Sequence, residues 1–259
     1  MRIVIIGAGN LSFSLAPALS RAGWQIVQVL SRTRESALAL AALLGCEAET
    51  DPTKIEKDAD VYIYCLKDEV YTSSSYSQEI ARSVNSSTFH LLTAGSVSWE
   101  VLGHTNVGTI YPFQTFSKAE PITDFSDVPI LYEGSDDRTE EVIRTIGRSI
   151  SKRLYKADAA SRGRLHLAGV FANNFSNCMY ALAAEQMEKA GLPFELLYPI
   201  IEQTVSKIHR LRPREAQTGP AVRGDEEVMQ KHLALLEDSG EKEIYQSISR
   251  NIREFAVNH

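Results

Sequence analysis

The sequence predicts an α/β domain with a doubly wound, mostly parallel sheet, followed by an all-helical domain. Residues 3–6 form an unbroken apolar segment without polar alternation, which is typical of a strand buried on both faces of a parallel sheet. Strand-like and helix-like patterns then alternate to about residue 156. Beyond that point apolar side chains recur at helical spacing. We therefore expect one domain at 1–156 and a second at 157–259.

A glycine-rich turn follows the first strand. Gly7 permits a tight turn, and Gly9 lets the backbone approach a pyrophosphate, whose charge would meet the free N–H groups of the next helix. Ser12 takes the third position of the pattern, where glycine or alanine is usual. The turn predicts a dinucleotide site contacted by Gly7, Gly9, Asn10 and Leu11. A strand, turn and helix without a ligand is the alternative.

The end of the second strand, expected over residues 24–30, indicates which dinucleotide binds. An NAD site usually offers an Asp or Glu to the ribose here, but this chain has a cluster of Ser31, Arg32, Thr33 and Arg34. Hydroxyl and guanidinium groups would accept a 2′-phosphate that a carboxylate would repel. This cluster therefore predicts NADP as the cofactor. The alternative is that Thr33 only caps the following helix while the arginines are solvated.

The remaining elements of the first domain follow in order. We expect helices at 36–44 and 136–151, a polar helix containing Ser73-Ser74-Ser75, and strands at 46–50, 59–66, 88–94, 107–111, 128–133 and 152–155. Ligands of open α/β sheets bind outside the carboxyl ends of the strands. The strand end Leu66-Lys67-Asp68 is therefore expected to border the cofactor, as are Ala94 and Gly95 at the end of the next strand.

The second domain is expected to open with one unusually long helix over residues 157–190, with further helices at 194–211, 225–236 and 241–256. On an ideal helix His166, Asn173 and Asn177 would lie within roughly 40° of one another, with Arg162 near the same stripe. Buried polar side chains need partners. The stripe either contacts another helix or forms a polar wall facing nicotinamide and substrate. In the second interpretation His166, Asn173 and Asn177 are the catalytic candidates.

Cationic side chains gather after the helix at 194–211. The cluster begins with His209, Arg210, Arg212 and Arg214. The dipole of that helix could alone explain Arg210 and Arg212. In the loop that follows, Gly219-Pro220 and Gly224 bracket Arg223, and Asp225 is expected to cap the next helix. Such a loop suits either capture of an anionic substrate or contact with a partner subunit.

Composition limits the classes of partner. Of the 259 residues 44% are hydrophobic and 23% charged, and the net charge of −6 argues against nucleic acid. The longest apolar run, residues 37–44, is too short to span a bilayer, and the first strand leaves no room for a signal peptide. Cys46, Cys65 and Cys178 lack the spacing of a zinc site or disulfide framework. We expect a cytoplasmic protein without a metal site and without a membrane partner.

Several of these segments resemble known families. Gly7–Leu11, Ser31–Thr33 and Ala94–Ser96 resemble the NADP-binding domain of the pyrroline-5-carboxylate reductase and coenzyme-F420-dependent NADP oxidoreductase group. Over nearly its whole length the chain more closely resembles the Rossmann-like oxidoreductase family DUF2520, through Tyr111–Phe116, Ala172–Phe175 and Thr218–Asp225. This resemblance implies a helical domain like that of six-phosphogluconate dehydrogenase and dimerisation through it. It implies no established substrate.

Two positions depart from the related patterns. DUF2520 members usually carry histidine where this chain has Tyr111. Gly169, Asn173 and Asn177 resemble a G-x-x-x-K-x-x-x-N pattern of β-hydroxyacid dehydrogenases, with Asn173 in place of the catalytic lysine. A neutral amide cannot deliver the proton that carbonyl reduction requires. Either His166 delivers it, or the substrate is an imine that needs little acid help, or no hydride is transferred.

Two classes of function follow. In the first, the protein is an NADPH-dependent reductase of a small, anionic carbonyl or imine compound, held between Gln114, the stripe from His166 to Asn177, and Arg223. In the second, it is a non-catalytic dinucleotide-binding sensor or scaffold. Room beside the nicotinamide favours the reductase, whereas a cleft filled by Tyr111 or Phe113 favours the sensor. Either would act as a homodimer joined through the helical domain.

Overall fold

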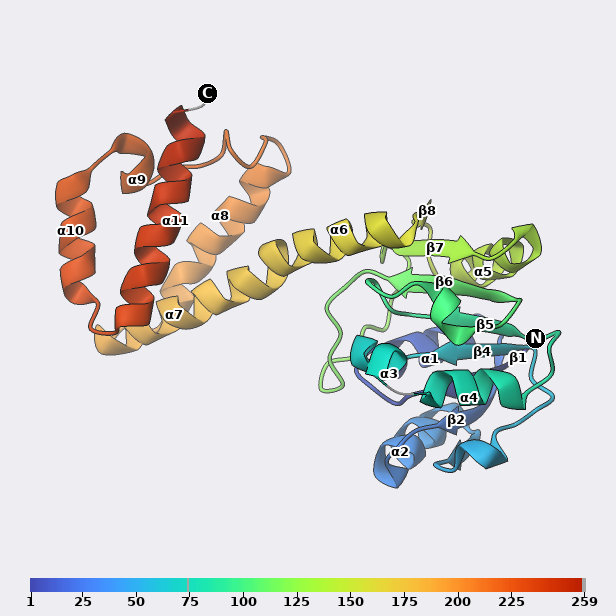
Figure 1. Cartoon of the computed structure of the whole chain (residues 1–259). Helices are drawn as coiled ribbons and strands as arrows, with labels where there is room; N and C mark the ends of the chain where they lie inside the picture. The colour runs from blue at the N-terminus through green and yellow to red at the C-terminus, as the bar shows by residue number, and fades with distance from the viewer. Residues whose placement is uncertain (74, 258–259) are drawn as a thin grey trace. The chain divides into compact units, whose positions relative to one another are not determined.

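The structure is a computed structural model that describes residues 1–73 and 75–257. The chain divides into two compact units, Met1–Asn173 and Asn174–His259 (Figure 1). The described strands all belong to the first unit, and the regular elements described in the second unit are all helices. The predicted combination of an α/β part and an all-helical part is therefore confirmed. The division falls within the long helical region, beyond the junction at 156 that the sequence predicts for the domains.

The first unit is built on one sheet whose described strands follow the order β3-β2-β1-β4-β5-β6-β7-β8. Neighbouring strands are parallel except for β6 and β7. The strands are β1 (Arg2–Ile6), β2 (Gln25–Leu30), β3 (Glu47–Glu49), β4 (Val61–Tyr64), β5 (Phe89–Leu92), β6 (Val107–Pro112), β7 (Ile130–Gly134) and β8 (Leu154–Lys156). The order reverses between β1 and β4, which is where ligands of doubly wound sheets bind.

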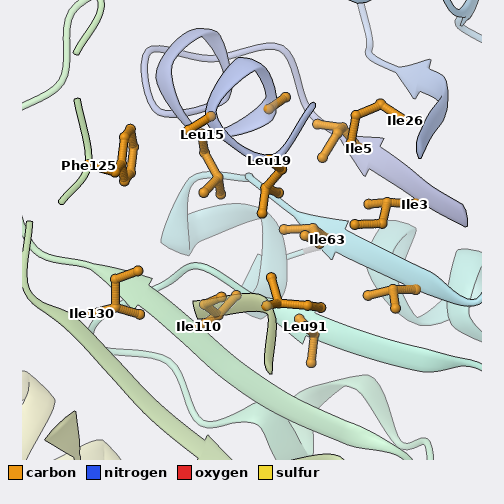
Figure 2. Close-up of a cluster of buried hydrophobic side chains, with 14 of the residues drawn as sticks. Ile3, Ile5, Leu15, Leu19, Ile26, Ile63, Leu91, Ile110, Phe125 and Ile130 are labelled. Carbon is orange, nitrogen blue, oxygen red and sulfur yellow. The ribbon is translucent and has the colours of Figure 1, made fainter. Parts of the chain in front are cut away.

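Side chains on the two faces of the sheet form two buried clusters. On one face Ile3, Ile5 and Ile63 pack with Leu15 and Leu19 of the first helix (Figure 2). The alternate residues of the same strands, such as Val4, Ile6, Tyr62 and Tyr64, form the cluster on the other face. Both faces of β1 are covered, and this explains why residues 3–6 are apolar without alternation.

The α-helices of this unit lie between strands, except for the last one, which follows β8. They are α1 (Ser12–Arg21), α2 (Arg34–Leu44), α3 (Asp68–Ser73), α4 (Tyr76–Ser83), α5 (Asp137–Ile150) and α6 (Ala159–Gly169), with short 3₁₀ turns at Pro52–Lys54 and Trp99–Leu102. Where the sequence predicts one polar helix, the structure has α3 and α4. Of the three serines expected within that helix, Ser74 lies outside the described residues.

The strand β7 runs against its neighbour, a direction that the sequence does not reveal. It pairs antiparallel with β6, which places Gly108 opposite Gly134. A Cβ at Gly108 would lie 2.5 Å from the carbonyl oxygen of Glu133 and 2.6 Å from Cδ1 of Ile143 on α5. The glycine thus allows β6, β7 and α5 to approach one another closely. The carboxyl ends of β1, β2, β4, β5 and β6 all lie at one edge of the sheet.

The long helix predicted over residues 157–190 is present without a break over residues 159–189, but its middle part is not α-helical. A π-helical segment, Val170–Phe175, separates α6 from α7 (Ser176–Lys189). A π-helix bonds each residue to the fifth along, so it holds more residues per turn than an α-helix. The period of 3.6 residues that predicted a shared stripe for His166, Asn173 and Asn177 therefore does not run through this region. Nothing in the apolar spacing distinguishes the segment from an α-helix.

The second unit buries few apolar side chains. Its further helices are a 3₁₀ turn (Phe194–Leu197), α8 (Tyr198–Ile208), α9 (Pro220–Arg223), α10 (Glu226–Leu235) and α11 (Ser239–Val257). Among its side chains that the structure describes, Ala221 and Met229 are the buried hydrophobic ones. Large apolar side chains such as Ile200 and Leu235 are mostly exposed. Within residues 1–73 and 75–257, no helix is both long enough and apolar enough to span a membrane.

Candidate functional site

A pocket of about 260 Å³ opens at the carboxyl ends of β1, β2 and β4. This is the sheet edge at which the strand order reverses. The pocket is lined by Gly7, Ala8, Gly9, Ser31, Arg32, Thr33, Ser36, Cys65, Leu66, Lys67, Val70 and Tyr76. The lining contains two cationic side chains and no acidic one, so it favours an anionic ligand.

The glycine turn has the geometry that a pyrophosphate requires. Gly7 has a φ of +99°, and a Cβ there would lie 2.4 Å from the carbonyl oxygen of Cys65, so only glycine fits. At Gly9 the nearest atom to such a Cβ would be that same oxygen at 4.0 Å, which leaves the backbone open toward the pocket. The first N–H groups of α1 follow this turn. The residues present therefore fit a dinucleotide phosphate.

Ser12 has a structural reason for standing at the third position of the glycine pattern. Its buried hydroxyl donates a hydrogen bond of 2.5 Å to the carbonyl oxygen of Gly7. The amide of Gly7 in turn donates to the carbonyl oxygen of Leu30 at 2.7 Å. These bonds join the start of α1, the turn and the end of β2. The serine thus stabilises the turn with a hydrogen bond that glycine or alanine could not make.

The residues after β2 form the cationic side of the pocket. Thr33 occupies the N-cap position of α2, yet its side chain makes no capping hydrogen bond, which gives the purely capping interpretation no support. Arg32 lies close enough to Tyr76 to act on its ionisation. Burial raises the pKa of the Tyr76 phenol while the Arg32 guanidinium lowers it, and burial is the larger effect. An uncharged ring therefore stands beside the guanidinium.

Lys67 lines the pocket, as expected for the end of β4, whereas Ser36 and Tyr76 were missed by sequence reasoning. Ser36 lies in the first turn of α2, so it could have been found by proximity to Thr33. Tyr76 begins α4, and no sequence signal connects it to the glycine turn. Cys65 also lines the pocket, where burial raises the pKa of its thiol to about 11 and keeps it protonated.

Not every predicted cofactor residue lines this pocket. Gly7, Gly9, Ser31, Arg32, Thr33 and Leu66 do, whereas Asn10, Leu11, Ala94 and Gly95 do not. Ala94 and Gly95 are buried, and a Cβ on Gly95 would lie 2.7 Å from Cζ of Tyr111. The ring of Tyr111 therefore packs directly on the turn after β5.

Tyr111 and His166 form a pair at the same sheet edge. Tyr111 lies near the carboxyl end of β6, and its hydroxyl is 3.1 Å from Nδ1 of His166 on α6. Burial and, to a lesser degree, the nearby Asp68 carboxylate raise the pKa of the Tyr111 phenol. Asp68 also accepts a hydrogen bond from the hydroxyl of Ser96. Tyr111 therefore keeps its proton near pH 7, and its hydroxyl lies within hydrogen-bond distance of the His166 ring.

The other residues proposed for the substrate are distributed over both units. Asn173 lies in the π-helical segment, while Asn177 on α7 and Arg223 on α9 belong to the second unit. Gln114 is exposed, and its side-chain oxygen accepts a hydrogen bond from the amide of Thr115 at 2.8 Å. These residues stay predictions as substrate contacts.

Arg162 does not belong to an exposed polar stripe. Its side chain is completely buried and donates 2.7 Å hydrogen bonds to a Glu133 carboxylate oxygen and to the carbonyl oxygen of Ala157. It joins the start of α6 to β7, which is a structural role. In the described part of the chain, no group of three or more His, Cys, Asp or Glu side chains is arranged to hold a metal ion.

The second-unit loop adopts the backbone that its glycines predict. Gly219 and Gly224 have φ angles of +119° and +68°, so α9 is bracketed by two left-handed positions. The Asp225 carboxylate accepts a hydrogen bond from the amide of Val228 at 3.2 Å and caps α10, as expected. Arg223 lies exposed at the end of α9.

The fold and this site define a class: a Rossmann-type unit with a dinucleotide-phosphate pocket, followed by a helical unit. Residues 2–85 match the family described as "NADP oxidoreductase coenzyme F420-dependent", and residues 128–252 match "Domain of unknown function (DUF2520)". The solved structure of the "putative NADP oxidoreductase BF3122" from Bacteroides fragilis is 42% identical, covers 98% of each chain and has a TM-score of 0.92. The chain belongs to the DUF2520 family of NADP-oxidoreductase-like proteins, as its motifs predict.

More distant structures share the fold. Protein TM1727 from Thermotoga maritima is 23% identical, covers 99% of this chain and 98% of its own, and has a TM-score of 0.69. An imine reductase from Pseudomonas sp. is 18% identical, with 96% and 92% coverage and a TM-score of 0.64. At these identities the likeness concerns the fold alone. No curated protein sequence matches the chain.

Proposed function

We propose that the protein is an NADP(H)-dependent oxidoreductase that reduces a small, anionic carbonyl or imine compound. One observation carries the proposal. The glycine- and arginine-lined pocket and the Tyr111–His166 pair both lie at the carboxyl edge of the sheet, and β5 separates their strands. A phosphate-binding turn and a proton donor at one edge are the two parts that such a reduction needs.

In the proposed reaction, one set of residues would bind the cofactor and another would supply a proton. The backbone of Gly7 and Gly9 and the side chains of Ser31, Arg32 and Thr33 would hold the dinucleotide, which supplies a hydride when bound. Reduction of a C=O or C=N bond also adds a proton to oxygen or nitrogen. The phenol of Tyr111 would donate that proton and His166 would replace it.

Four further residues belong to the proposal because of their chemistry. Asn173 and Asn177 would orient the substrate with their amides, and Gln114 and Arg223 would bind its anionic group. The imine reductase among the similarly folded proteins supports including C=N compounds among the substrates to be tested.

A second candidate has an observation in its favour. Tyr111 packs on Gly95, and a Cβ on Gly169 would lie 2.7 Å from the ring of Phe113, so both aromatic rings lie directly on glycines near the proposed substrate position. Rings that fill this space would favour a non-catalytic dinucleotide-binding sensor or scaffold. The hydrogen bond between Tyr111 and His166 favours the reductase, because an aromatic ring that only fills space does not need a hydrogen bond to histidine.

A substrate screen distinguishes the two candidates. NADPH absorbance would be followed with 2-oxo acids, cyclic imino acids, and matched aldehydes and imines that lack a carboxylate. The reductase predicts turnover of at least one carboxylate-bearing compound and weaker or no turnover of its neutral counterpart. NADPH binding in calorimetry without turnover of any compound would contradict the reductase and support the sensor.

A further inference from the structure

A lysine far along the chain lies beside the cofactor pocket. Lys118 belongs to the segment between β6 and β7, and its amide donates a hydrogen bond to the side-chain oxygen of Asn10 at 3.3 Å. Its Nζ lies 3.5 Å from the hydroxyl oxygen of Ser36 on α2 and 4.9 Å from the ring centroid of Phe13 on α1. Backbone and ammonium contacts together hold Lys118 between the first turns of two helices.

Ser36 connects this ammonium to the pocket. Its side chain lines the same pocket as Arg32 and Thr33, so Nζ of Lys118 lies at the rim on the side that α2 forms. The contacts of Nζ are with a hydroxyl and an aromatic ring, neither of which carries a charge. Lys118 takes part in none of the ion pairs found in residues 1–73 and 75–257. Its positive charge is therefore not neutralised by a carboxylate.

We propose that Lys118 is a second specificity-determining cation for the 2′-phosphate of NADP, acting together with Arg32. The inference rests on the proposed cofactor. A phosphate monoester carries a charge of about −1.5 to −2 near pH 7, more than one guanidinium neutralises. The planar guanidinium can bind two of its oxygens, and a lysine supplies a compact point charge to the remaining one. Because Ser36 lines the pocket and its hydroxyl lies near Nζ, the ammonium charge of Lys118 lies at the pocket beside Ser36.

Binding measurements on the full chain test this without relying on activity. Calorimetry would give dissociation constants for NADP⁺, NAD⁺, adenosine 2′,5′-bisphosphate and AMP. For Lys118→Gln we expect binding of the two 2′-phosphate ligands to weaken about three- to tenfold, because one exposed charge contact is lost. Binding of NAD⁺ and AMP should stay within about twofold of wild type. Lys118→Arg, which keeps the charge, should restore most of the affinity for NADP⁺.

Three other variants serve as comparisons for the binding of these ligands by Lys118→Gln. Arg32→Ala should weaken NADP⁺ binding about ten- to a hundredfold and leave NAD⁺ nearly unchanged, since a charge-assisted contact is lost. Arg34→Ala removes the second arginine of the predicted cluster, which is exposed and does not line the pocket, and Lys57→Gln removes an exposed lysine of the same unit. Both should bind all four ligands like wild type.

The outcomes separate the inference from the proposed cofactor. Equal weakening of NAD⁺ and NADP⁺ by Lys118→Gln would assign the charge to the pyrophosphate and overturn the inference, while wild-type preference for NADP⁺ stands. Unchanged NADP⁺ binding in that variant would overturn it as well. A wild-type protein that binds NAD⁺ as tightly as NADP⁺ would overturn the cofactor proposal itself, and the role of Lys118 with it.

Discussion

At the scale of single residues, the Tyr111 hydroxyl is the group whose removal separates the two candidate functions. Tyr111→Phe keeps the ring that packs on Gly95 and removes only the atom that contacts His166. If the hydroxyl donates the proton, turnover should fall by about 10²–10⁴ while NADP⁺ affinity is kept. His166→Asn should also lower turnover, by the same range if histidine is the primary donor. Steady-state kinetics and calorimetry on the same preparations measure both quantities.

The control for this pair is an exposed tyrosine of the same unit. Tyr155 on β8 is 55% exposed, so Tyr155→Phe should leave both turnover and affinity unchanged. A structural role for the pair predicts something different. In that case Tyr111→Phe and His166→Asn would lower the melting temperature, and activity per folded molecule would equal that of wild type.

His90 makes the first unit sensitive to acid. It is completely buried on β5, where Nδ1 lies 2.8 Å from the Tyr64 hydroxyl and Nε2 lies 3.1 Å from the Thr88 hydroxyl. Because Thr88 donates its own hydrogen to the carbonyl oxygen of Asn85, it accepts from Nε2, and Nδ1 accepts from Tyr64. In the neutral ring both nitrogens are hydrogen-bonded. A second proton, on Nδ1, would have no acceptor. Burial, and to a lesser degree the neighbouring His104, lower the pKa of His90 to about 3.

His90 binds its proton at a different pH in the folded and the unfolded chain, so the free energy of unfolding depends on pH. An unfolded histidine titrates near pH 6.5, so between about pH 6.5 and 3 the unfolded chain binds a proton that the folded chain does not. The free energy of unfolding should therefore fall as the pH falls, by up to about 1.4 kcal/mol per pH unit from this side chain. Urea unfolding at several pH values between 7 and 4 measures the slope. His90→Gln should be less stable at pH 7 but show a shallower slope, and an identical slope would contradict the assignment.

At the scale of elements, two glycines of the first unit predict opposite effects of the same substitution. Gly108→Ala would force a methyl group against Glu133 and Ile143 and should destabilise the unit by about 1–3 kcal/mol through overpacking. Gly163 lies within α6, and a Cβ there would meet no atom within 4 Å. Gly163→Ala should be neutral or stabilising by about 0.5–1 kcal/mol, because alanine favours a helix. Denaturant unfolding compares the two, and similar losses from both would contradict the packing argument.

The sequence predicts those elements whose signals are local. The β1 strand, the glycine turn and the residues after β2 lie within the first 36 positions, and each carries its own pattern of burial, backbone freedom or charge. The direction of β7 is not predictable in this way, because β-branched residues pack equally well in either direction. The π-helical segment at Val170–Phe175 preserves apolar spacing on the scale of one turn, so the spacing of apolar residues does not distinguish it from an α-helix.

The candidate site is harder to predict than the fold because its parts come from distant segments. Tyr76 and Lys118 reach the pocket region from elements whose placement depends on the whole sheet. Tyr111 contacts His166 across 55 positions, and sequence reasoning named His166 as a catalytic candidate but gave Tyr111 no part as a proton donor. Local patterns identify a phosphate-binding turn, whereas contacts between segments decide which side chains surround it.

At the scale of the whole molecule, the second unit is expected to need a partner surface. With Ala221 and Met229 as the buried hydrophobic side chains among those described there, its core is small for a unit of this length. Ile200 on α8 is 65% exposed and Leu235 on α10 is 72% exposed. We propose that a second copy of the chain covers such side chains in a homodimer with an apolar interface.

Light scattering coupled to size-exclusion chromatography tests this proposal. At micromolar concentration we expect a mass of twice the 28.7 kDa of one chain. Ile200→Lys should shift the population toward monomer, because a buried charge without a partner is costly at an interface. Glu202→Lys, at an exposed position on the same helix, should not. A wild-type monomer would refute the dimer.

The cationic, acid-free lining of the pocket has a consequence for the rates of cofactor exchange. The chain as a whole carries a net charge of −6, so a polyanion approaching from solution first meets a repulsive field and is attracted only close to the pocket. Added salt screens the distant repulsion over a Debye length of about 10 Å at 0.1 M, and it also weakens the contacts at the rim. We therefore expect stopped-flow traces to show dissociation accelerating with ionic strength while association stays level or rises. A fall in the association rate would mean that attraction already dominates at long range.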